Sequence, residues 1–263
     1  EIAGKHYYKI PIFLRSLFAK YIYFVEKYAI KFVRTINAYS NEDMRKFIEI
    51  YAIPQEKIQV NIMGYKTEIV NNPFKKEESR KIFNIEKNKF VIIFHGSYYI
   101  NYPNQEAINI IRNQICPQIE DEDILFLIAG KIPPFRKKKN LRFLGFVKDL
   151  KSFLYTADIA IVPVFRGSGI RTKIIDYLSA KIPIITTKQG IKGLSFLNNV
   201  HGFIVSDLNP IEDMIKKILE LKNNSKKISE FKENIEKLLV SHYNWDEIHK
   251  LLEKKYKEII ENS

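Results

Sequence analysis

The sequence predicts an α/β protein built on a parallel β-sheet that helices cover on both faces. Two observations favour this class. From Phe90 onward, short apolar runs alternate with helical segments, which is the pattern of strands joined by crossover helices. A glycine turn follows each of the first four apolar runs, at Gly96, Gly130, Gly145 and Gly167/Gly169. Because ligands of such sheets bind outside the carboxyl ends of the strands, we expect the binding site at these turns.

The composition supports a soluble globular chain of one large or two modest domains. Of the 263 residues, 46% are apolar and 28% are charged, which is an ordinary balance. The single cysteine, Cys116, excludes an internal disulfide and a cysteine zinc cluster and suits a reducing compartment. No uncharged apolar run approaches the roughly 20 residues that span a bilayer. We therefore expect a cytoplasmic protein.

The charge is strongly positive, with 43 Lys and Arg against 30 Asp and Glu, a net charge of +13. Three interpretations fit: a solvated lysine-rich surface, attraction to anionic membranes or phosphorylated substrates, and nucleic-acid binding. The chain carries none of the usual nucleic-acid motifs, so we expect no nucleic-acid partner.

Residues 1–72 predict a segment of helices and short strands that precedes the main α/β region. Apolar residues recur every three to four positions over residues 6–35, which predicts a helix. This segment is aromatic and basic, so it either packs on a sheet or lies on an anionic membrane at the inner face of the cell. The elements expected next are the strand Thr35–Tyr39, the helix Asn41–Tyr51 capped by Ser40, the strand Ile58–Ile62 and the polar linker Asn71–Lys89.

Residues 73–240 predict the main α/β lobe, and residues 241–263 a closing helix. The expected strands are Phe90–Phe94, Ile124–Ala129, Leu141–Leu144, Ile159–Val164, Ile182–Thr186 and Gly202–Val205. The expected helices are Pro103–Ile119, which begins with a proline, and Asp149–Thr156, Arg171–Ala180, Pro210–Leu221, Ser225–Leu239 and Trp245–Asn262.

The segment 165–185 carries the most chemistry. A glycine-rich turn leads directly into a helix, so that backbone N–H groups and the positive end of the helix dipole can face one anion. Arg171 and Lys173 add two cations, and Asp176 lies about one turn further along the helix. The pattern predicts a site for a phosphate and for hydroxyl groups.

A wider set of motifs occurs in order along residues 85–210. It comprises Phe94-His95-Gly96-Ser97, Pro103-Asn104, Leu127-Ile128-Ala129-Gly130, Phe143-Leu144-Gly145-Phe146-Val147-Lys148-Asp149, the segment above and His201-Gly202-Phe203. This order resembles the donor-binding lobe of retaining GT-B glycosyltransferases of the "glycosyl transferases group 1" type (family 4-like). The flanking segments resemble the end of that family's first lobe and its closing helix, which returns to the first lobe.

The resemblance implies a GT-B fold of two Rossmann-like lobes. It implies a hexosyltransferase-like enzyme that moves a sugar from a nucleotide-diphosphate sugar to a glycan or lipid-linked acceptor, commonly in polysaccharide biosynthesis. A full acceptor lobe would need about 70 to 100 further residues before Glu1, judged from the size of βα repeats. The sequence leaves open whether this chain is a fragment and whether it is active alone.

The resemblance also assigns residues. Lys173 would contact the diphosphate, and we infer the same role for Arg171; with Gly96 and Ser97 they form the catalytic set. The predicted donor-binding residues are Gly130, Val147, Gly167, Ser168, Gly169, Thr172 and Asp176. Two departures from the family's paired glutamates stand out. Asp176 shortens the ribose-binding carboxylate by one methylene, and Ser168 removes the acid near the sugar.

Several residues keep two interpretations. His95 lies near the site or is a buried structural histidine, Lys131 is a phosphate ligand or a surface lysine, and Tyr98, Tyr99 or Asn101 could touch substrate. Asn104 simply begins its helix.

Asp121-Glu122-Asp123 matches a metal-binding string of another transferase fold, but it precedes a strand at the opposite edge. We therefore expect no metal and no cofactor beyond the nucleotide-sugar substrate. Two alternatives remain: a noncatalytic nucleotide-binding module or inactive remnant, and a GT-B-fold sugar-nucleotide epimerase.

Overall fold

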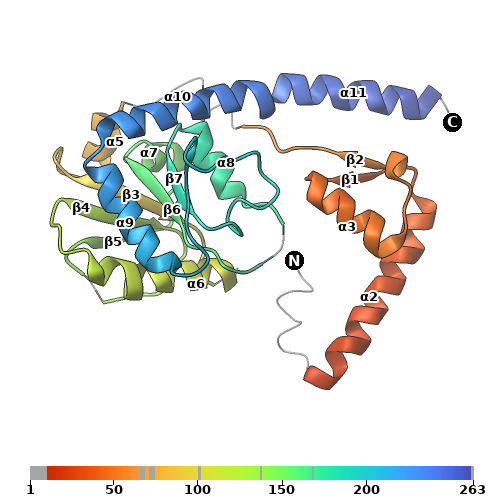
Figure 1. The fold of residues 1–263 in the computed structure, drawn as a ribbon, viewed down its shortest axis with the longest axis horizontal. Helices are drawn as coiled ribbons and strands as arrows, with labels where there is room; N and C mark the ends of the chain where they lie inside the picture. The colour runs from red at the N-terminus through yellow and green to blue at the C-terminus, as the bar shows by residue number, and fades with distance from the viewer. Residues whose placement is uncertain are drawn as a thin grey trace. The chain divides into compact units, whose positions relative to one another are not determined.

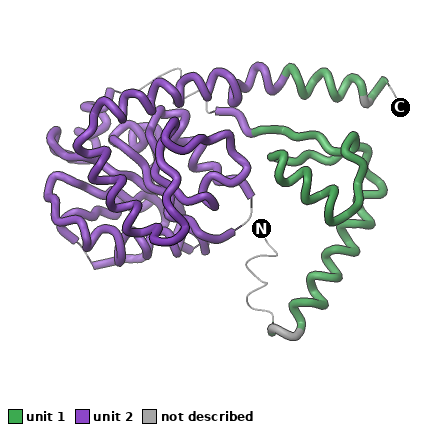
Figure 2. The backbone as a smooth tube through the Cα atoms, in the orientation of Figure 1, with its two compact units in different colours: residues 1–62, 250–263 green, residues 63–249 purple. Residues whose placement is uncertain are grey.

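The chain forms two compact units. The computed structural model describes residues 11–65, 69–70, 75–99, 102–136, 138–167 and 169–261. Unit 1 comprises Glu1–Ile62 with Lys250–Ser263, and unit 2 comprises Met63–His249 (Figure 2). Within the described residues, no helix combines the length and the apolar character needed to cross a bilayer.

Unit 1 is a small α/β segment with its own core. Its elements are α2 (Ile12–Phe32), β1 (Ile36–Ala38), α3 (Asn41–Tyr51), β2 (Ile58–Val60) and the end of α11 (Trp245–Glu261). Strands β1 and β2 pair in parallel, and Ala38, Ile53 and Ile58 form the centre of the core. The helix α3 begins as predicted, because the Ser40 side chain accepts a hydrogen bond from the Asp43 N–H group at 3.0 Å.

Unit 2 is built on a six-stranded sheet in the order β5-β4-β3-β6-β7-β8, with every pairing parallel (Figure 1). The strands are β3 (Phe90–His95), β4 (Ile124–Ala129), β5 (Leu141–Gly145), β6 (Ile159–Val162), β7 (Ile184–Thr186) and β8 (Gly202–Ile204). All six residues of β4 are buried, because a strand covered on both faces needs an unbroken apolar run. The prediction of a parallel α/β sheet is confirmed.

Helices cover both faces of this sheet. They are α5 (Lys76–Ile82), α6 (Tyr102–Ile110), α7 (Leu150–Leu154), α8 (Thr172–Ser179), α9 (Pro210–Lys222) and α10 (Ser225–His242). In the view of Figure 1, α6 lies below the sheet, whereas α5, α7, α8 and α10 lie above it. The chain winds outward from β3 to β5 in one direction and from β6 to β8 in the other. The carboxyl ends of β3 and β6 therefore flank a topological switch point, where such sheets bind ligands.

Two elements differ from the predictions. The expected linker 71–89 contains α5, whose buried residues are the polar Ser79 and Arg80; no apolar period marked this helix, so the linker prediction was wrong there. The expected helix 103–119 is α6 followed by a π-helical turn, Ile111–Ile115, and a 3₁₀ turn, Cys116–Gln118. Pro117 lacks the N–H group that a continuing α-helix requires. Residues 6–10 of the first predicted helix lie outside the described residues.

Candidate functional site

Three glycine turns meet at the carboxyl edge of the sheet in unit 2. A Cβ atom on Gly130 would lie 2.1 Å from the Gly96 carbonyl oxygen, so the turns after β3 and β4 touch through bare backbone. The Gly96 N–H group donates to Ala129 O at 2.9 Å, and the Gly130 N–H group donates to Gly145 O at 2.7 Å. Because these N–H groups are already used, Gly96 and Gly130 contribute space at the site rather than hydrogen-bond donors.

Lys173 lies at the centre of this edge. It belongs to the first turn of α8 and is only 8% exposed. Its Nζ atom donates to Asn104 Oδ1 at 2.5 Å and lies 4.0 Å from the centre of the Phe94 ring. Burial, together with the charge of Arg171, lowers the pKa of Lys173 to about 7, although Asp176 acts in the opposite direction. The fold therefore offsets little of the cost of removing the Lys173 ammonium from water.

Arg171 holds the glycine-rich turn together. Its guanidinium donates to the carbonyl oxygens of Gly169 at 2.9 Å and Arg166 at 3.0 Å. Gly167 has a φ of +109°, which favours glycine, and a Cβ atom there would lie 2.8 Å from Arg171 Nη2 and would push the guanidinium aside. From the other side, Gln189 Nε2 donates to Gly167 O at 2.5 Å. The structure thus shows Arg171 bound to the turn that was predicted to receive the phosphate.

Asp176 forms a second polar group on α8. Its Oδ2 atom lies 3.1 Å from His95 Nε2. The His95 backbone N–H group donates to the Tyr177 hydroxyl at 2.9 Å, and the two rings pack edge to face with centroids 5.0 Å apart. Burial raises the pKa of Tyr177, which keeps its hydroxyl protonated. The structure places His95 beside Asp176, the predicted ribose-binding carboxylate, in a largely buried and hydrogen-bonded position that fits both of its interpretations.

The turn after β3 carries a further polar group, Ser97. Its Oγ atom is buried and makes no hydrogen bond to the residues that the structure describes. The next residue, Tyr98, donates from its backbone to Lys131 O at 2.9 Å, so Lys131 contributes a carbonyl to the frame of the site. A buried hydroxyl without a partner is costly unless a ligand satisfies it.

The remaining predicted residues are spread more widely. Thr172 is exposed at the start of α8. Val147 is half-buried and follows β5, which lies two strands from β3. Strands are spaced about 4.8 Å apart, so Val147 borders the site at a distance. Ser168 and Asn101 lie outside the described residues.

Sequence reasoning missed the role of Asn104 and Phe94. Asn104 was predicted only to begin a helix, yet its side chain bonds the buried lysine. Phe94 was assigned to a strand, yet its ring faces the Lys173 ammonium. The sequence did contain a signal for Asn104, because an amide side chain in the first turn of the helix after a central strand lies at the ligand-binding edge of such a sheet.

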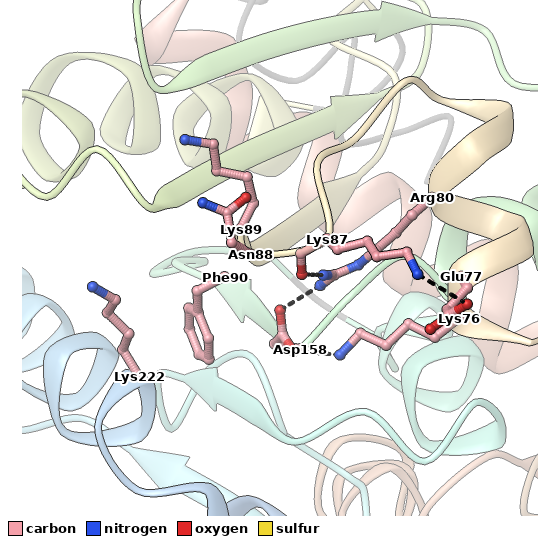
Figure 3. A pocket seen from close by; sticks show the side chains of 9 residues that line it. All are labelled: Lys76, Glu77, Arg80, Lys87, Asn88, Lys89, Phe90, Asp158 and Lys222. Atoms are coloured by element: carbon pink, nitrogen blue, oxygen red, sulfur yellow. Dashed lines mark hydrogen bonds and ion pairs between the residues drawn. The ribbon is translucent and has the colours of Figure 1, made fainter.

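The opposite edge of the sheet contains a basic cavity of about 420 Å³ at the amino ends of β3 and β6 (Figure 3). It is lined by Lys76, Glu77, Arg80, Lys87, Asn88, Lys89, Phe90, Asp158 and Lys222. Arg80 Nη2 lies 2.7 Å from Asp158 Oδ2, and Lys76 forms an ion pair with the same carboxylate. Arg80 also donates to the carbonyl oxygens of Thr156 at 3.1 Å and Lys87 at 3.0 Å. This arginine joins α5 to the sheet.

The described residues contain no group of three or more His, Cys, Asp or Glu side chains that could hold a metal ion. Asp121 and Glu122 instead form ion pairs with Lys222 and Lys139, which lower the pKa of each carboxyl group below its usual range. They lie before β4, at the edge away from Lys173.

Comparison with known proteins identifies both a family and a fold. The family model "Glycosyl transferases group 1" matches residues 89–224. No curated protein matches the chain in sequence. A glycosyltransferase from Rickettsia africae ESF-5 superposes with a TM-score of 0.74 and 18% identity, over 97% of this chain and 69% of its own.

Two further solved structures show the same fold. Sucrose-phosphate synthase from Thermosynechococcus elongatus has a TM-score of 0.74 and 13% identity, over 92% of this chain and 62% of its own. Anabaena Alr3699/HepE, solved with UDP and glucose, has a TM-score of 0.68 and 14% identity, over 87% of this chain and 64% of its own. The chain therefore spans about two thirds of the length of these proteins.

Proposed function

Because this chain belongs to the glycosyl transferases group 1 family, we propose that unit 2 binds a nucleotide-diphosphate sugar and that the protein transfers the sugar with retention of configuration. The observation that carries the proposal is the buried Lys173 ammonium at the switch point of the sheet, beside the start of α8. A desolvated cation at a helix N-terminus suits a diphosphate.

The donor proposal also draws on the solved relatives. Anabaena Alr3699/HepE has been solved with UDP and with UDP-glucose. In this chain, Lys173 would contact the diphosphate, and the turn fastened by Arg171 would present its backbone to the same group. Asp176 would accept hydrogen bonds from the ribose hydroxyls, with His95 at 3.1 Å fixing the carboxylate. Gly130 and Val147 would border the base.

The proposed reaction breaks the bond between the anomeric carbon and the β-phosphate oxygen. The acceptor hydroxyl oxygen bonds to the anomeric carbon on the same face, and its proton passes to an oxygen of the departing diphosphate. Negative charge grows on the diphosphate during this step, and preorganised donors stabilise it. Lys173 supplies the positive charge and Ser97 Oγ a hydroxyl donor, so we propose a metal-independent transfer.

Calorimetry with UDP and GDP tests the donor site. One of the two should bind, and Lys173→Met should weaken that binding by one to two orders of magnitude, since charged hydrogen bonds contribute about 1.5 to 3 kcal/mol. Lys139→Met is the matched control: it removes one charge from an exposed lysine paired with Glu122 and should change nothing. Binding of neither nucleotide, or equal binding by Lys173→Met, would show that the donor site is wrongly assigned.

Sugar transfer needs a separate measurement. Incubation with UDP- and GDP-sugars should release nucleotide, faster when a glycan or lipid-linked acceptor is present. Nucleotide binding without any such release would favour the noncatalytic module, and conversion of the sugar itself would favour the epimerase.

We also propose that α2 contacts an anionic membrane, which would bring a lipid-linked acceptor to a cytoplasmic enzyme. Leu17, Tyr21, Phe24, Tyr28 and Phe32 are all more than 60% exposed and recur at spacings of three and four residues, so they share one face. Lys20, Lys27 and Lys31 are also exposed on this helix, and its one acid, Glu26, bonds Tyr51. An aromatic face beside lysines suits an anionic bilayer surface.

Liposome flotation tests this contact. Phosphatidylglycerol vesicles should carry the protein upward, and Phe24→Glu with Tyr28→Glu should abolish flotation. Leu208→Glu, at an exposed leucine of unit 2, is the control. Absence of wild-type flotation would remove the proposal, and a dimer disrupted by the α2 variants would assign the face to self-association instead.

A further inference from the structure

The stretch from the end of β3 to the first turn of α6 surrounds the Lys173 ammonium, which lies about 70 residues further along the chain. Asn104 comes from the first turn of α6, Phe94 from the end of β3, and Gly96 from the turn after β3. A Cβ atom on Gly96 would lie 2.9 Å from Lys173 Nζ and 2.8 Å from Asn104 Nδ2. The amide and the ammonium are therefore packed together against bare backbone, and each limits where the other can lie.

The hydrogen-bond acceptor of the Lys173 ammonium is a neutral amide oxygen rather than a carboxylate. An ammonium has three N–H donors, and Asn104 Oδ1 takes one of them at 2.5 Å. Among the residues that the structure describes, Lys173 forms no ion pair with a carboxylate, although the charge of Asp176, three residues further along α8, acts on it through space. An amide oxygen fixes the position of the ammonium without adding a negative charge, whereas a carboxylate would neutralise it. When Lys173 is protonated, its positive charge and its other N–H donors remain for an anion.

The first turn of α6 also connects this group to the glycine-rich turn. A Cβ atom on Gly167 would lie 2.9 Å from Pro103 Cγ, and Pro103 precedes Asn104. The same turn of α6 thus contacts the segment that leads into α8, on which Lys173 is carried. This packing fixes the backbone from which Asn104 reaches the lysine.

We propose that Asn104 is a positioning residue, which holds the Lys173 ammonium toward the donor diphosphate while leaving its charge unneutralised. The inference rests on the proposed function, because it takes Lys173 as the diphosphate ligand. It goes beyond that function by assigning a role to a residue that would not itself touch the substrate.

The test measures the protonation of Lys173 directly. Lysine labelled with ¹³C at Cε reports each ammonium by its chemical shift across pH, and Lys173→Met identifies the signal. Asn104→Asp should raise the pKa of Lys173, because a carboxylate favours the charged form. Asn104→Ala should lower it, since the hydrogen bond to the charged form is lost. Asn113→Ala, an exposed amide in the helical turn after α6, should leave it unchanged.

Affinity gives the second measurement. UDP-glucose is a suitable probe, because its diphosphate diester does not titrate near neutral pH. Asn104→Asp should weaken binding about tenfold or more, because the lysine is already paired. Asn104→Ala should weaken binding several-fold at pH 7, and lowering the pH should restore much of it by protonating the lysine.

The outcomes separate the two claims. If both Asn104 variants lower thermal stability but leave the Lys173 titration and the affinity unchanged, Asn104 is only structural and the inference is wrong. If wild-type protein does not bind UDP-glucose or UDP, the proposed function fails, while the ¹³C titration still decides whether Asn104 controls the state of Lys173.

Discussion

Unit 2 buries two cations at opposite edges of one sheet, and their surroundings differ in kind. Arg80, 6% exposed, is paired with Asp158 at 2.7 Å (Figure 3) and also donates to two carbonyl oxygens. Lys173, 8% exposed, has one neutral amide and an aromatic ring. The charge and the N–H donors of Arg80 are satisfied by groups of the fold. Lys173 has no such counter-charge, so its charge and its remaining N–H donors are available to a ligand.

The difference shows how burial alone misleads. A buried cation that has a carboxylate and several carbonyl acceptors joins elements of the fold, as Arg80 joins α5 to the sheet. A buried cation that has only a neutral acceptor destabilises the unliganded protein, and such groups concentrate at functional sites. Whether a buried lysine or arginine is structural or functional can therefore be judged from its hydrogen-bond acceptors.

Asp158→Asn should have the largest effect. The substitution keeps the shape but leaves Arg80 and Lys76 without their counter-charge, and Val91 N–H donates to the same carboxylate at 2.6 Å. Breaking a buried pair costs about 3 to 5 kcal/mol. Urea denaturation should show that loss, with UDP affinity unchanged in the folded fraction.

The control for this prediction is Asp207→Asn. Asp207 is exposed and pairs with the exposed Lys188, so the free energy of unfolding should change by less than about 0.5 kcal/mol. If Asp158→Asn lost UDP affinity, the comparison between the two edges would fail, because a pair at the amino edge of the sheet would then affect nucleotide binding at the carboxyl edge.

Lys173→Met should act in the opposite direction on stability. Methionine fills a similar volume without a charge to desolvate, and replacing buried charge with apolar groups can stabilise by about 1 to 4 kcal/mol. The free energy of unfolding should rise at pH 7 while nucleotide affinity is lost. A destabilised Lys173→Met would mean that this lysine, like Arg80, serves the fold.

The fold could be predicted largely from the sequence, because its signals are local. Fully apolar strands such as Ile124–Ala129 and a capped helix such as Asn41–Tyr51 follow from short patterns. The helix α5 could not be predicted in this way. Its buried residues are Ser79 and Arg80, and Arg80 is stabilised by Asp158, which lies 78 residues away in the sequence.

The site could be predicted only in part, for the same reason. The residue types and the glycine turns predicted a site at the carboxyl edge, where the structure brings Gly96, Gly130 and Lys173 together, but which side chains pair depends on where distant segments meet. Arg171 has the charge of a phosphate ligand, yet its guanidinium is bound to carbonyl oxygens of the turn. Asn104 has no charge at all, yet it contacts the buried lysine across 69 residues of sequence.

Gly96→Ala should disturb the carboxyl edge by crowding. The added methyl would lie 2.8 Å from the Asn104 amide and 2.9 Å from Lys173 Nζ, and overpacking of this kind costs about 1 to 3 kcal/mol. Both thermal stability and UDP affinity should fall. Gly145→Ala is the matched control: its φ of +70° strains the backbone, but nothing lies within 4 Å of the added atom. It should lower stability with little change in affinity.

The smallest expected effect is a pH dependence that only the carboxyl edge produces. Unfolded Lys173 keeps its proton up to about pH 10.4, whereas the folded lysine, with a pKa of about 7, releases it near neutrality. Between these values the unfolded state binds more protons, so the free energy of unfolding rises with pH.

From pH 7 to pH 8 the rise should be about 1 kcal/mol. Urea denaturation of wild type and Lys173→Met at both values isolates this contribution, because other titrating groups cancel in the difference. If the free energy of unfolding changes equally in the two proteins between pH 7 and pH 8, Lys173 stays charged in the folded state. Lys173 and Arg80 would then differ only in the geometry of their hydrogen bonds.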